Sequence, residues 1–437
     1  MNISSRFRQD LGYYLMGVII PGAINAISVP LLKKLLGTSD FGKYGISYNL
    51  LLLLTAFSVG WLCQSIIRFK FTAAGISNSF YKQIFRLGTW VVLILSVSAL
   101  LINMVYFNNP IAFSLLFSTA IIFCGYQNLL IGLSQANFLS RFTMYTEALR
   151  TAVFFILAVT LLKLDVMPSI NALFLAIVVS YIASSLLLFK KNKLYTILFK
   201  AEGLQTTTEV FEISNVFRYG LPLAGWYLIS YLLLFLDKPL LVQHMGYEVQ
   251  GNYQALYELI NKGSVVLLIP VLYALFPLLS NAFENDDIAG GMKLLKKLIL
   301  IELGIMITGL LAYWLVGFAI LQYVLSVPDT FDYKFSGFLM LASILIWQIG
   351  MLVHKPFELR KQTNMLLWIV IASLAVFLIL LYLVKIYQPV AVYLYTTPFL
   401  GASITYVCLC LYLVGYYKKM KTHLHQAKNL VKQKLFD

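Results

Sequence analysis

Long apolar runs alternate with short polar stretches along almost the whole chain. A helix that crosses a hydrocarbon core of about 30 Å needs about 20 mostly apolar residues, because each residue rises about 1.5 Å. Runs of about this length occupy residues 11–32, 45–67, 87–107, 111–133, 142–162, 170–189, 219–241, 253–279, 298–325, 335–353, 364–384 and 390–417. We therefore predict an all-α, polytopic membrane protein with twelve transmembrane helices. The first run follows Arg6 and Arg8, but it is too long for the apolar part of a secretory signal and counts as a span.

The composition agrees with this interpretation. Of the 437 residues, 60% are apolar and only 12% are charged, against about a quarter charged in a typical soluble domain. The longest stretch outside the predicted spans has roughly thirty residues, too few for a soluble catalytic or ATP-hydrolysing domain. The four cysteines lie inside apolar runs without metal-binding spacing, so we interpret them as packing residues.

Positive charge is unevenly distributed between the two sides of the predicted bundle. Lysine and arginine number 33 against 18 acidic residues, which gives a net charge of +15. When these bases are sorted by loop, 25 fall on one side, 7 fall on the other and Lys262 lies within a span. Because basic loops stay in the cytoplasm, we predict that both termini are cytoplasmic, which requires an even number of spans. Most of the net charge therefore describes orientation, and we expect the basic tail to rest on anionic lipid.

The chain also contains an internal repeat, since a shift of 209 residues aligns residues 30–48 with 239–257. Seven of the nineteen aligned positions are identical: Pro30 with Pro239, Leu31 with Leu240, Leu32 with Leu241, Gly37 with Gly246, Gly42 with Gly251, Tyr44 with Tyr253 and Tyr48 with Tyr257. Both copies join the first and second spans of a six-span half, so the repeat is parallel and predicts two six-helix bundles around a central cavity. The predicted boundaries are 1–190 for the first bundle, 191–213 for a cytoplasmic linker, 214–417 for the second bundle and 418–437 for the tail.

The first copy of the repeat has the spacing of a phosphate-binding loop. Gly37, Gly42 and Lys43 fit the pattern GxxxxGK, but Tyr44 stands where Ser or Thr would hold magnesium. The second copy has Asn252 in place of the lysine, and neither copy lies in a βαβ unit. We therefore interpret the glycines as residues that end a helix and shape a tight turn.

A wider set of residues resembles a known family. The set in the second half is Gly220, Pro222, Asp237, Lys238, Gly246, Gly251, Tyr253, Lys262 and Pro270, and the set in the first half is Pro21, Pro30, Gly37, Asp40, Gly42, Tyr44 and Gly45. Both sets are similar to spans of the polysaccharide and O-antigen repeat-unit flippases. These belong to the multidrug, oligosaccharidyl-lipid and polysaccharide exporter superfamily. The resemblance covers essentially the whole chain in span count, half-repeat and short loops.

The resemblance implies a V-shaped transporter of MATE-like fold, not an enzyme. Its substrate would be an undecaprenyl-diphosphate-linked oligosaccharide, a repeat unit of O-antigen, capsule or exopolysaccharide. The protein would move this substrate from the cytoplasmic to the periplasmic leaflet of a bacterial inner membrane. Expected partners are the lipid-linked oligosaccharide, membrane lipids and the polysaccharide polymerase machinery, with no nucleic acid and no cofactor.

Three pairs of ionisable residues interrupt the predicted spans. Burying such a group costs about 2.5 to 3.5 kcal/mol on insertion scales, so it usually faces a wet cavity or a partner. The pairs are Glu147 with Arg150, Asp237 with Lys238, and Glu258 with Lys262. Structural ion pairing or snorkelling to the interface would be enough to explain each pair.

A role in substrate binding is the alternative to structural pairing. Under the 209-residue shift, the four charged residues of the second half align with Ser28, Val29, Asn49 and Leu53. A purely architectural need would tend to recur in both halves. We hypothesise that Arg150 and Lys262 face the cavity and attract the diphosphate, with Lys238 nearer the exit.

The acidic partners and a few further residues complete the set of candidates. Asp237, Glu258 or Glu147 could couple transport to protons or sodium, as an alternative to drive by the membrane potential alone. Arg68, at a cytoplasmic span end, is a candidate for first contact with the substrate. Trp226 and Tyr227 lie deep in the seventh span, where a flat ring can stack on a sugar.

Three other functions compete with the flippase, and one of them, a non-transporting scaffold, is disfavoured by the cavity-forming repeat. A cation-coupled multidrug exporter of the same superfamily would benefit from an acidic cavity, whereas the pairs here are neutral and accompanied by isolated bases. A membrane-embedded glycosyltransferase or acyltransferase would need clustered acid, base or metal-binding residues, and the sequence contains neither DxD nor HxxxxD. The sequence therefore favours an anionic substrate that is transported.

Overall fold

The structure is a computed structural model of the chain that describes residues 3–69, 78–105, 110–137, 139–192, 213–284, 288–360, 362–388 and 390–415. Within these ranges the regular elements are all helices. Ten stretches are long and apolar enough to cross a membrane. One of them, Ile213–Ser264, holds two crossings, and the 25-residue helix α5 supplies another. The described residues therefore form the twelve crossings that the apolar pattern predicts.

The first half of the chain forms six long helices. Their bounds are α1 Ile3–Leu36, α2 Thr38–Phe69, α3 Asn78–Val105, α4 Ile111–Ala136, α5 Ser140–Leu164 and α6 Ser169–Lys191. α2 packs on α4, α3 packs on α4, and α5 packs on both α1 and α6. Their apolar side chains on the inner faces form the core of this half, as the buried Leu62, Phe117 and Phe174 illustrate.

The second half is built from broken helices. Its elements are α8 Ile213–Leu233, α9 Asp237–Glu284, α10 Ile288–Ala312, the π-helix Tyr313–Gly317, α11 Phe318–Leu325, α12 Phe331–Val353, α13 Lys355–Leu359, α14 Thr363–Tyr387 and the 3-10 helix Val392–Thr396, which continues as an α-helix over 397–415. α10, the π-helix and α11 follow one another as a single crossing, Gly290–Leu325. α12 packs on α9 and α10, and α14 packs on α8.

The seventh crossing, expected as an uninterrupted span over 219–241, is broken by a turn over residues 234–236. Pro239 contributes to the break, because it has no N–H to donate to the carbonyl of Phe235, four residues earlier. The amide of Lys238 bonds that carbonyl instead, at 3.1 Å, in the tighter pattern of a turn. A new helix, α9, then begins at Asp237. The equivalent Pro30 lies inside the unbroken helix α1, so proline alone does not decide the difference.

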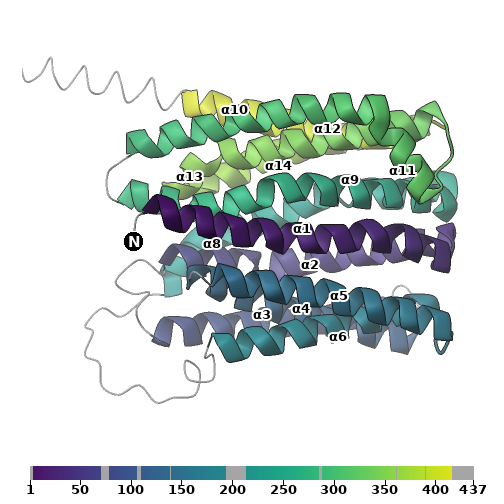
Figure 1. Cartoon of the computed structure of the whole chain (residues 1–437), viewed down its shortest axis with the longest axis horizontal. Coiled ribbons are helices and arrows are strands. Elements are labelled where there is room, and N and C mark those ends of the chain that lie inside the picture. The colour runs from purple at the N-terminus through teal and green to yellow at the C-terminus, as the bar shows by residue number, and fades with distance from the viewer. Residues whose placement is uncertain are drawn as a thin grey trace, which may run out of the picture.

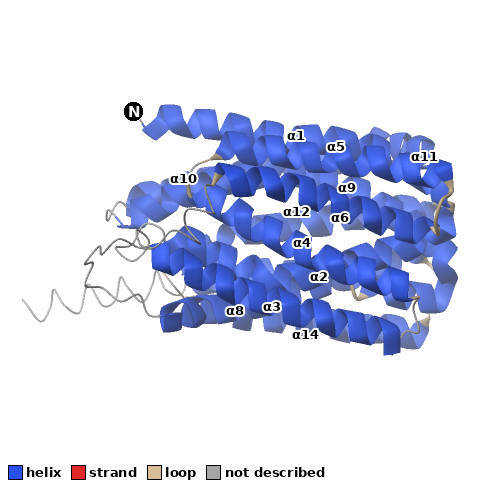
Figure 2. Cartoon of the chain, turned by 90° about the horizontal axis from the view of Figure 1, so that it is seen from below, coloured by secondary structure: helices blue, strands red, loops and turns tan. Residues whose placement is uncertain are grey.

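The two halves lie side by side, with α1 and α2 between the remaining helices (Figure 1). The helices run along the long axis of the molecule (Figure 2). We call the end that holds the N-terminus the near end and the opposite one the far end. Across the boundary between the halves, α1 packs on α9, and α2 packs on both α8 and α9.

The internal repeat is confirmed by its geometry at the far end. Gly37 and Gly246, which the 209-residue shift aligns, have φ of 78° and 84°, the left-handed region that favours glycine. Each ends one helix and starts another, as the sequence predicts. The equivalent glycines Gly42 and Gly251 then face each other, since a Cβ on Gly42 would lie 3.0 Å from the amide nitrogen of Gly251. The two copies of the repeat therefore contact each other at equivalent residues, Gly42 and Gly251.

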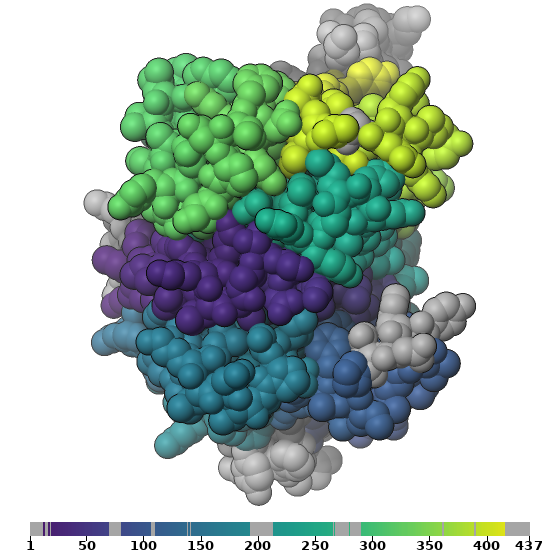
Figure 3. Space-filling view, turned by 90° about the vertical axis from the view of Figure 1, so that its right-hand side faces the viewer, coloured from purple at the N-terminus to yellow at the C-terminus, as the bar shows by residue number. Residues whose placement is uncertain are grey.

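Equivalent helix pairs repeat the same packing. α1, the first crossing of the first half, packs on α9, the second crossing of the second half. In the same way α8, the first crossing of the second half, packs on α2, the second crossing of the first half. The space-filling view of the far end shows the purple α1–α2 region in contact with the teal α9 region (Figure 3). The halves are thus joined by four helices, and the remaining helices flank them.

Candidate functional site

The ion pair of the second half lies beside the break between α8 and α9. Lys238 is almost completely buried, and its Nζ lies 3.3 Å from Oδ1 of Asp237. The Lys238 ammonium also donates to the carbonyl of Leu234, one of the acceptors that the turn leaves without a helical partner. The broken helix therefore creates the acceptors that a buried lysine requires.

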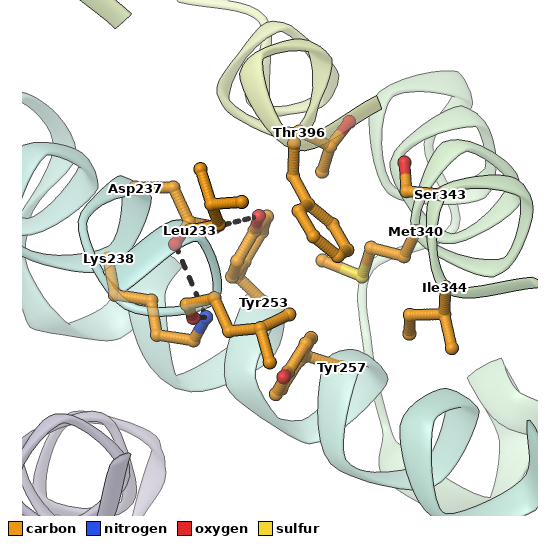
Figure 4. A pocket seen from close by; sticks show the side chains of 11 residues that line it. Leu233, Asp237, Lys238, Tyr253, Tyr257, Met340, Ser343, Ile344 and Thr396 are labelled. Atoms are coloured by element: carbon orange, nitrogen blue, oxygen red, sulfur yellow. Dashed lines mark hydrogen bonds and ion pairs between the residues drawn. The ribbon is translucent and has the colours of Figure 1, made fainter. Parts of the chain in front are cut away.

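Two tyrosines complete this cluster (Figure 4). The hydroxyl of Tyr253 donates to Oδ2 of Asp237 at 2.5 Å, and the Lys238 Nζ lies 4.1 Å from the centre of the Tyr257 ring. A cation over an aromatic ring at this distance is stabilised further by the ring quadrupole. Because all the charged atoms have partners, the cluster behaves as a neutral, closed unit.

The space beside this cluster is small. It lies among α8, α9, α12 and the 3-10 helix, and Met340, Ser343 and Thr396 line the wall opposite Asp237 and Lys238 (Figure 4). Its volume of about 10 Å³ holds about one water molecule. In this conformation the cluster cannot admit a sugar or a diphosphate, so any contact between Lys238 and substrate would require the wall to move.

The second ion pair lies at the boundary between the halves. On α9, the Lys262 Nζ is 2.5 Å from Oε2 of Glu258, and it also donates to Oδ1 of Asn25 on α1 at 3.4 Å. The side chain of Glu258 is only 8% exposed, whereas that of Lys262 is 29% exposed. The cation is therefore the accessible member of this pair.

A chain of amides extends the pair toward the far end. Gln254 donates to Glu258 at 3.0 Å, and Asn49 on α2 donates to Gln254 at 3.3 Å. Asn49 is the residue that the repeat aligns with Glu258. The polar chain thus links α9 with α1 and α2, and any separation of the halves must break part of it.

The third pair lies within the first half, on α5. The Arg150 Nη2 is 2.8 Å from Oε2 of Glu147, and Gln127 on α4 donates to the other carboxylate oxygen at 2.8 Å. The Arg150 guanidinium also lies 5.1 Å from the ring centre of Tyr181 on α6.

The remaining predicted residues are packed in different surroundings. The Trp226 indole donates to the Tyr406 hydroxyl at 2.9 Å and its ring stacks on Trp347, while the Tyr227 hydroxyl accepts a hydrogen bond from Gln64 of the first half. Arg68 is buried at the near end of α2. Stacking of Trp226 on a sugar stays a prediction, and it would require the ring to leave Trp347.

Lys33 on α1 makes a contact between the halves that its position in the sequence does not predict. Lys33, counted above as a loop charge, is buried and joins the halves. Its Nζ donates to Oδ1 of Asn252 on α9 and to the carbonyl of Leu325 at the end of α11, both at 2.7 Å. The Leu325 carbonyl accepts this bond at the C-terminus of α11, where Ser326 adopts a left-handed conformation and the last carbonyls lack helical donors. Lys33 and Asn252 both lie within the aligned segments 30–48 and 239–257, but the alignment does not show that they meet.

A further buried cluster lies at the near end of the second half. Lys355 and Glu358 on α13 form an ion pair of 2.5 Å, and the Nε2 of His354 lies 3.5 Å from the same carboxylate. The His354 Nδ1 is 2.8 Å from the Tyr406 hydroxyl, which connects the cluster to Trp226. From the sequence, Lys355 at a cytoplasmic span end is, like Arg68, a candidate for substrate entry or a topology charge. The structure buries it in the short helix α13.

Comparison with known proteins identifies the family. The family described as "Polysaccharide biosynthesis protein" matches residues 7–283, which span the whole first half and the first two crossings of the second. The chain belongs to this family. No curated protein matches the sequence.

Solved structures with the same fold are membrane transporters. A mutant of the Vibrio cholerae MATE transporter VcmN has a TM-score of 0.73 at 13% identity, with 96% of this chain and 97% of that chain covered. An outward-facing multidrug resistance MATE family transporter has a TM-score of 0.69 at 13% identity, with 97% of both chains covered. A transporter of the same superfamily from Pyrococcus furiosus, described as having a binding pocket of reverse polarity, has a TM-score of 0.68 at 12% identity, with 96% and 97% covered.

Family and fold together place the protein among the multi-pass membrane exporters of the multidrug, oligosaccharidyl-lipid and polysaccharide superfamily. At these identities the solved structures show the fold alone. The MATE-like architecture predicted from the spans and the repeat is confirmed, whereas the roles of the candidate residues stay predictions.

Proposed function

We propose that this exporter is a flippase for lipid-linked oligosaccharides. Its substrate is a repeat unit of a surface polysaccharide, such as O-antigen or capsule, attached to undecaprenyl diphosphate. The family match supports the link to polysaccharide biosynthesis. The observation that carries the proposal is the accessible Lys262 at the boundary between the halves, beside a Glu258 that is almost buried. Such a boundary presents positive charge to a diphosphate.

The two halves offer a physical route for the charged headgroup. Crossing about 30 Å of hydrocarbon is prohibitive for a hydrated diphosphate unless a polar path accompanies it. In the proposed cycle the halves separate first at one end and then at the other, so that Lys262 and Arg150 bind the diphosphate while the lipid tail stays in the bilayer. One of the links that must break is the Lys262 bond to Asn25.

We propose that both termini face the cytoplasm of a bacterial inner membrane, in keeping with the 25 to 7 distribution of basic residues. The membrane potential then drives an anion outward by about 2.3 kcal/mol per charge per 100 mV. Proton or sodium coupling through Asp237, Glu258 or Glu147 is the alternative. Dissipating the ion gradients of proteoliposomes while a potassium diffusion potential is held separates the two, because voltage-driven transport continues and coupled transport stops.

Four substitutions at the boundary pair test the role of Lys262. If the cation binds substrate, Lys262→Arg retains polysaccharide export, whereas Lys262→Gln and the double variant Glu258→Gln/Lys262→Gln lose most of it. If the lysine only neutralises Glu258, the double variant exports normally, because no carboxylate is left to neutralise. Glu258→Gln alone should keep export under the binding model. Protein levels in the membrane, measured by immunoblot, are the control for folding.

A cation-coupled multidrug exporter is the second candidate, favoured by the MATE transporters among the similar folds. The two functions differ in the charge of the cargo. Transport of a fluorescent cation into inverted vesicles, with no movement of undecaprenyl-diphosphate oligosaccharide, would select the multidrug exporter. Movement of the lipid-linked oligosaccharide without cation transport would select the flippase.

A further inference from the structure

A pocket of about 460 Å³ lies within the first half, among α3, α4 and α6. Its size is within the range of sites that hold small ligands. α3 packs on α2 and α4, on the side of the first half that flanks the joined helices α1 and α2. The pocket lies in the same half as the Glu147–Arg150 pair, but none of its lining residues belongs to the three ion pairs, and the proposed transport cycle does not use it.

The polar groups of the pocket are arranged along the membrane normal. Lys82, Arg86 and Thr89 follow one another at spacings of four and three, so they share one face of α3. Because α3 begins at the near end, Lys82 is nearest that end and Thr89 lies about 10 Å deeper. The pocket thus has two cations at its near end.

Hydroxyl groups lie deeper in the pocket than the cations, farther from the near end. The Tyr126 hydroxyl on α4 donates to the Thr89 hydroxyl at 2.9 Å. On α6 the Ser185 hydroxyl is buried, and among the described residues it has no hydrogen-bond partner. A buried hydroxyl without a partner costs free energy, so a ligand that supplies an acceptor here would be stabilised.

The rest of the wall is apolar and continues onto the surface that faces lipid. Leu186 and Phe189 on α6 line the pocket and are among the exposed large apolar side chains, as is Trp90, next to Thr89. In a membrane protein such residues contact acyl chains. A soluble anion would find only two cations at the rim of an apolar space, whereas an amphiphile would match both parts.

We propose that this pocket binds an anionic phospholipid from the leaflet at the near end. The phosphate lies against Lys82 and Arg86. The glycerol ester region, deeper in the membrane, contacts the hydroxyls of Thr89, Tyr126 and Ser185. The acyl chains leave the pocket past Leu186. Basic pockets between membrane helices recognise anionic headgroups by this combination of charge and shape. The proposal depends on the membrane position of the protein and not on which substrate it transports.

Native mass spectrometry of the detergent-purified full chain tests the proposal. The probes are phosphatidylglycerol and phosphatidylcholine with identical acyl chains. We expect the protein to retain phosphatidylglycerol preferentially. The double variant Lys82→Gln/Arg86→Gln should bind it about 30-fold more weakly, the effect of removing two cations near a headgroup. Arg86 is exposed, so Arg86→Gln provides a single variant that keeps the fold and should lose part of the preference.

A matched control removes two exposed lysines at the near end of the second half, Lys296→Gln/Lys297→Gln, and should bind phosphatidylglycerol as the wild type does. Equal retention of the two lipids by the wild type, or unchanged binding by the pocket variants, would overturn the proposal. Displacement of the lipid by millimolar glycerol 3-phosphate would show a site for soluble anions instead. Complete displacement of bound phosphatidylglycerol by equimolar undecaprenyl diphosphate would assign the pocket to the transported substrate and overturn the proposal.

Discussion

Lys238 shows how a charged residue becomes tolerable inside a membrane protein. Its ammonium contacts the Asp237 carboxylate, the Leu234 carbonyl and the ring of Tyr257. The repeat supplies the aromatic part in both halves, since Tyr44 and Tyr48 also stack on each other. The charged part occurs only in the second half, where Asp237 and Lys238 replace Ser28 and Val29. The tyrosines are therefore architecture, and the ion pair is an addition to it.

Removing the amine of Lys238 should destabilise the protein strongly. Lys238→Met leaves the buried Asp237 carboxylate without its cation, a loss of about 3 to 5 kcal/mol for a buried pair. The double variant Asp237→Asn/Lys238→Met removes both charges and should recover much of this loss. Thermal unfolding in detergent, followed by tryptophan fluorescence, measures the difference in Tm.

An exposed ion pair on α2 provides the matched control. Lys43 contacts Asp40 at 2.9 Å, with both side chains more than 40% exposed. Lys43→Met should change the free energy of unfolding by less than about 1 kcal/mol, because water screens such a pair. Equal effects of the two lysine substitutions would contradict the structural account of Lys238.

At the scale of helices, the glycine contact at the far end decides how closely α2 and α9 approach. A Cβ at Gly251 would overlap with the carbonyl oxygen of Thr38, which is backbone and cannot move aside easily. Glycine at both Gly42 and Gly251 lets the two backbones meet. The repeat in the sequence marked these positions, but nothing in one dimension showed that the two copies touch each other.

A larger side chain at this contact should hold the helices apart. Gly251→Val is expected to reduce polysaccharide export at least tenfold, because the far end can no longer close, which costs more than about 1.4 kcal/mol. Gly263→Val on the same helix is the control, since a Cβ there meets nothing within 4 Å. Normal export from Gly251→Val at wild-type protein levels would show that this closure is dispensable.

At the scale of the whole molecule, the structure is closed at the far end by contacts between the halves. Lys33 is bonded to Asn252 and to the end of α11, and the glycine contact lies close by. Toward the near end, Gln64 of the first half donates to the Tyr227 hydroxyl of the second half at 3.1 Å. Opening at either end therefore requires separation of polar groups across the boundary.

Loss of the Lys33 bonds should shift the protein toward opening at the far end. In Lys33→Met the Asn252 and Leu325 acceptors lose their donor, and the closed state loses its advantage. Spin labels on cysteines at the exposed positions Lys163 and Lys385, in a background without native cysteines, report the distance between the halves at that end. Lys34→Met, at the exposed neighbouring residue, should leave the distance distribution unchanged. A distance distribution for Lys33→Met identical to that of the wild type would show that the Lys33 bonds do not hold the far end closed.

The sequence alone was enough to predict the twelve crossings, the two related halves and the three ion pairs. Apolar length, a shift of 209 residues and spacings of one, three or four residues are properties of the chain in one dimension. Each of these ion pairs joins residues on adjacent turns or at a helix start, so local geometry was enough to form them.

Only the tertiary structure showed which charges are accessible and which segments meet. Lys33 and Asn252 are 219 residues apart, so their bond depends on how α1 packs on α9. The greater exposure of Lys262 than of Glu258, the break that buries Lys238, and the basic pocket of the first half also depend on neighbouring helices. Burial and long-range contacts arise when helices pack together, and the hydrophobic pattern specifies that a helix is buried without specifying against what.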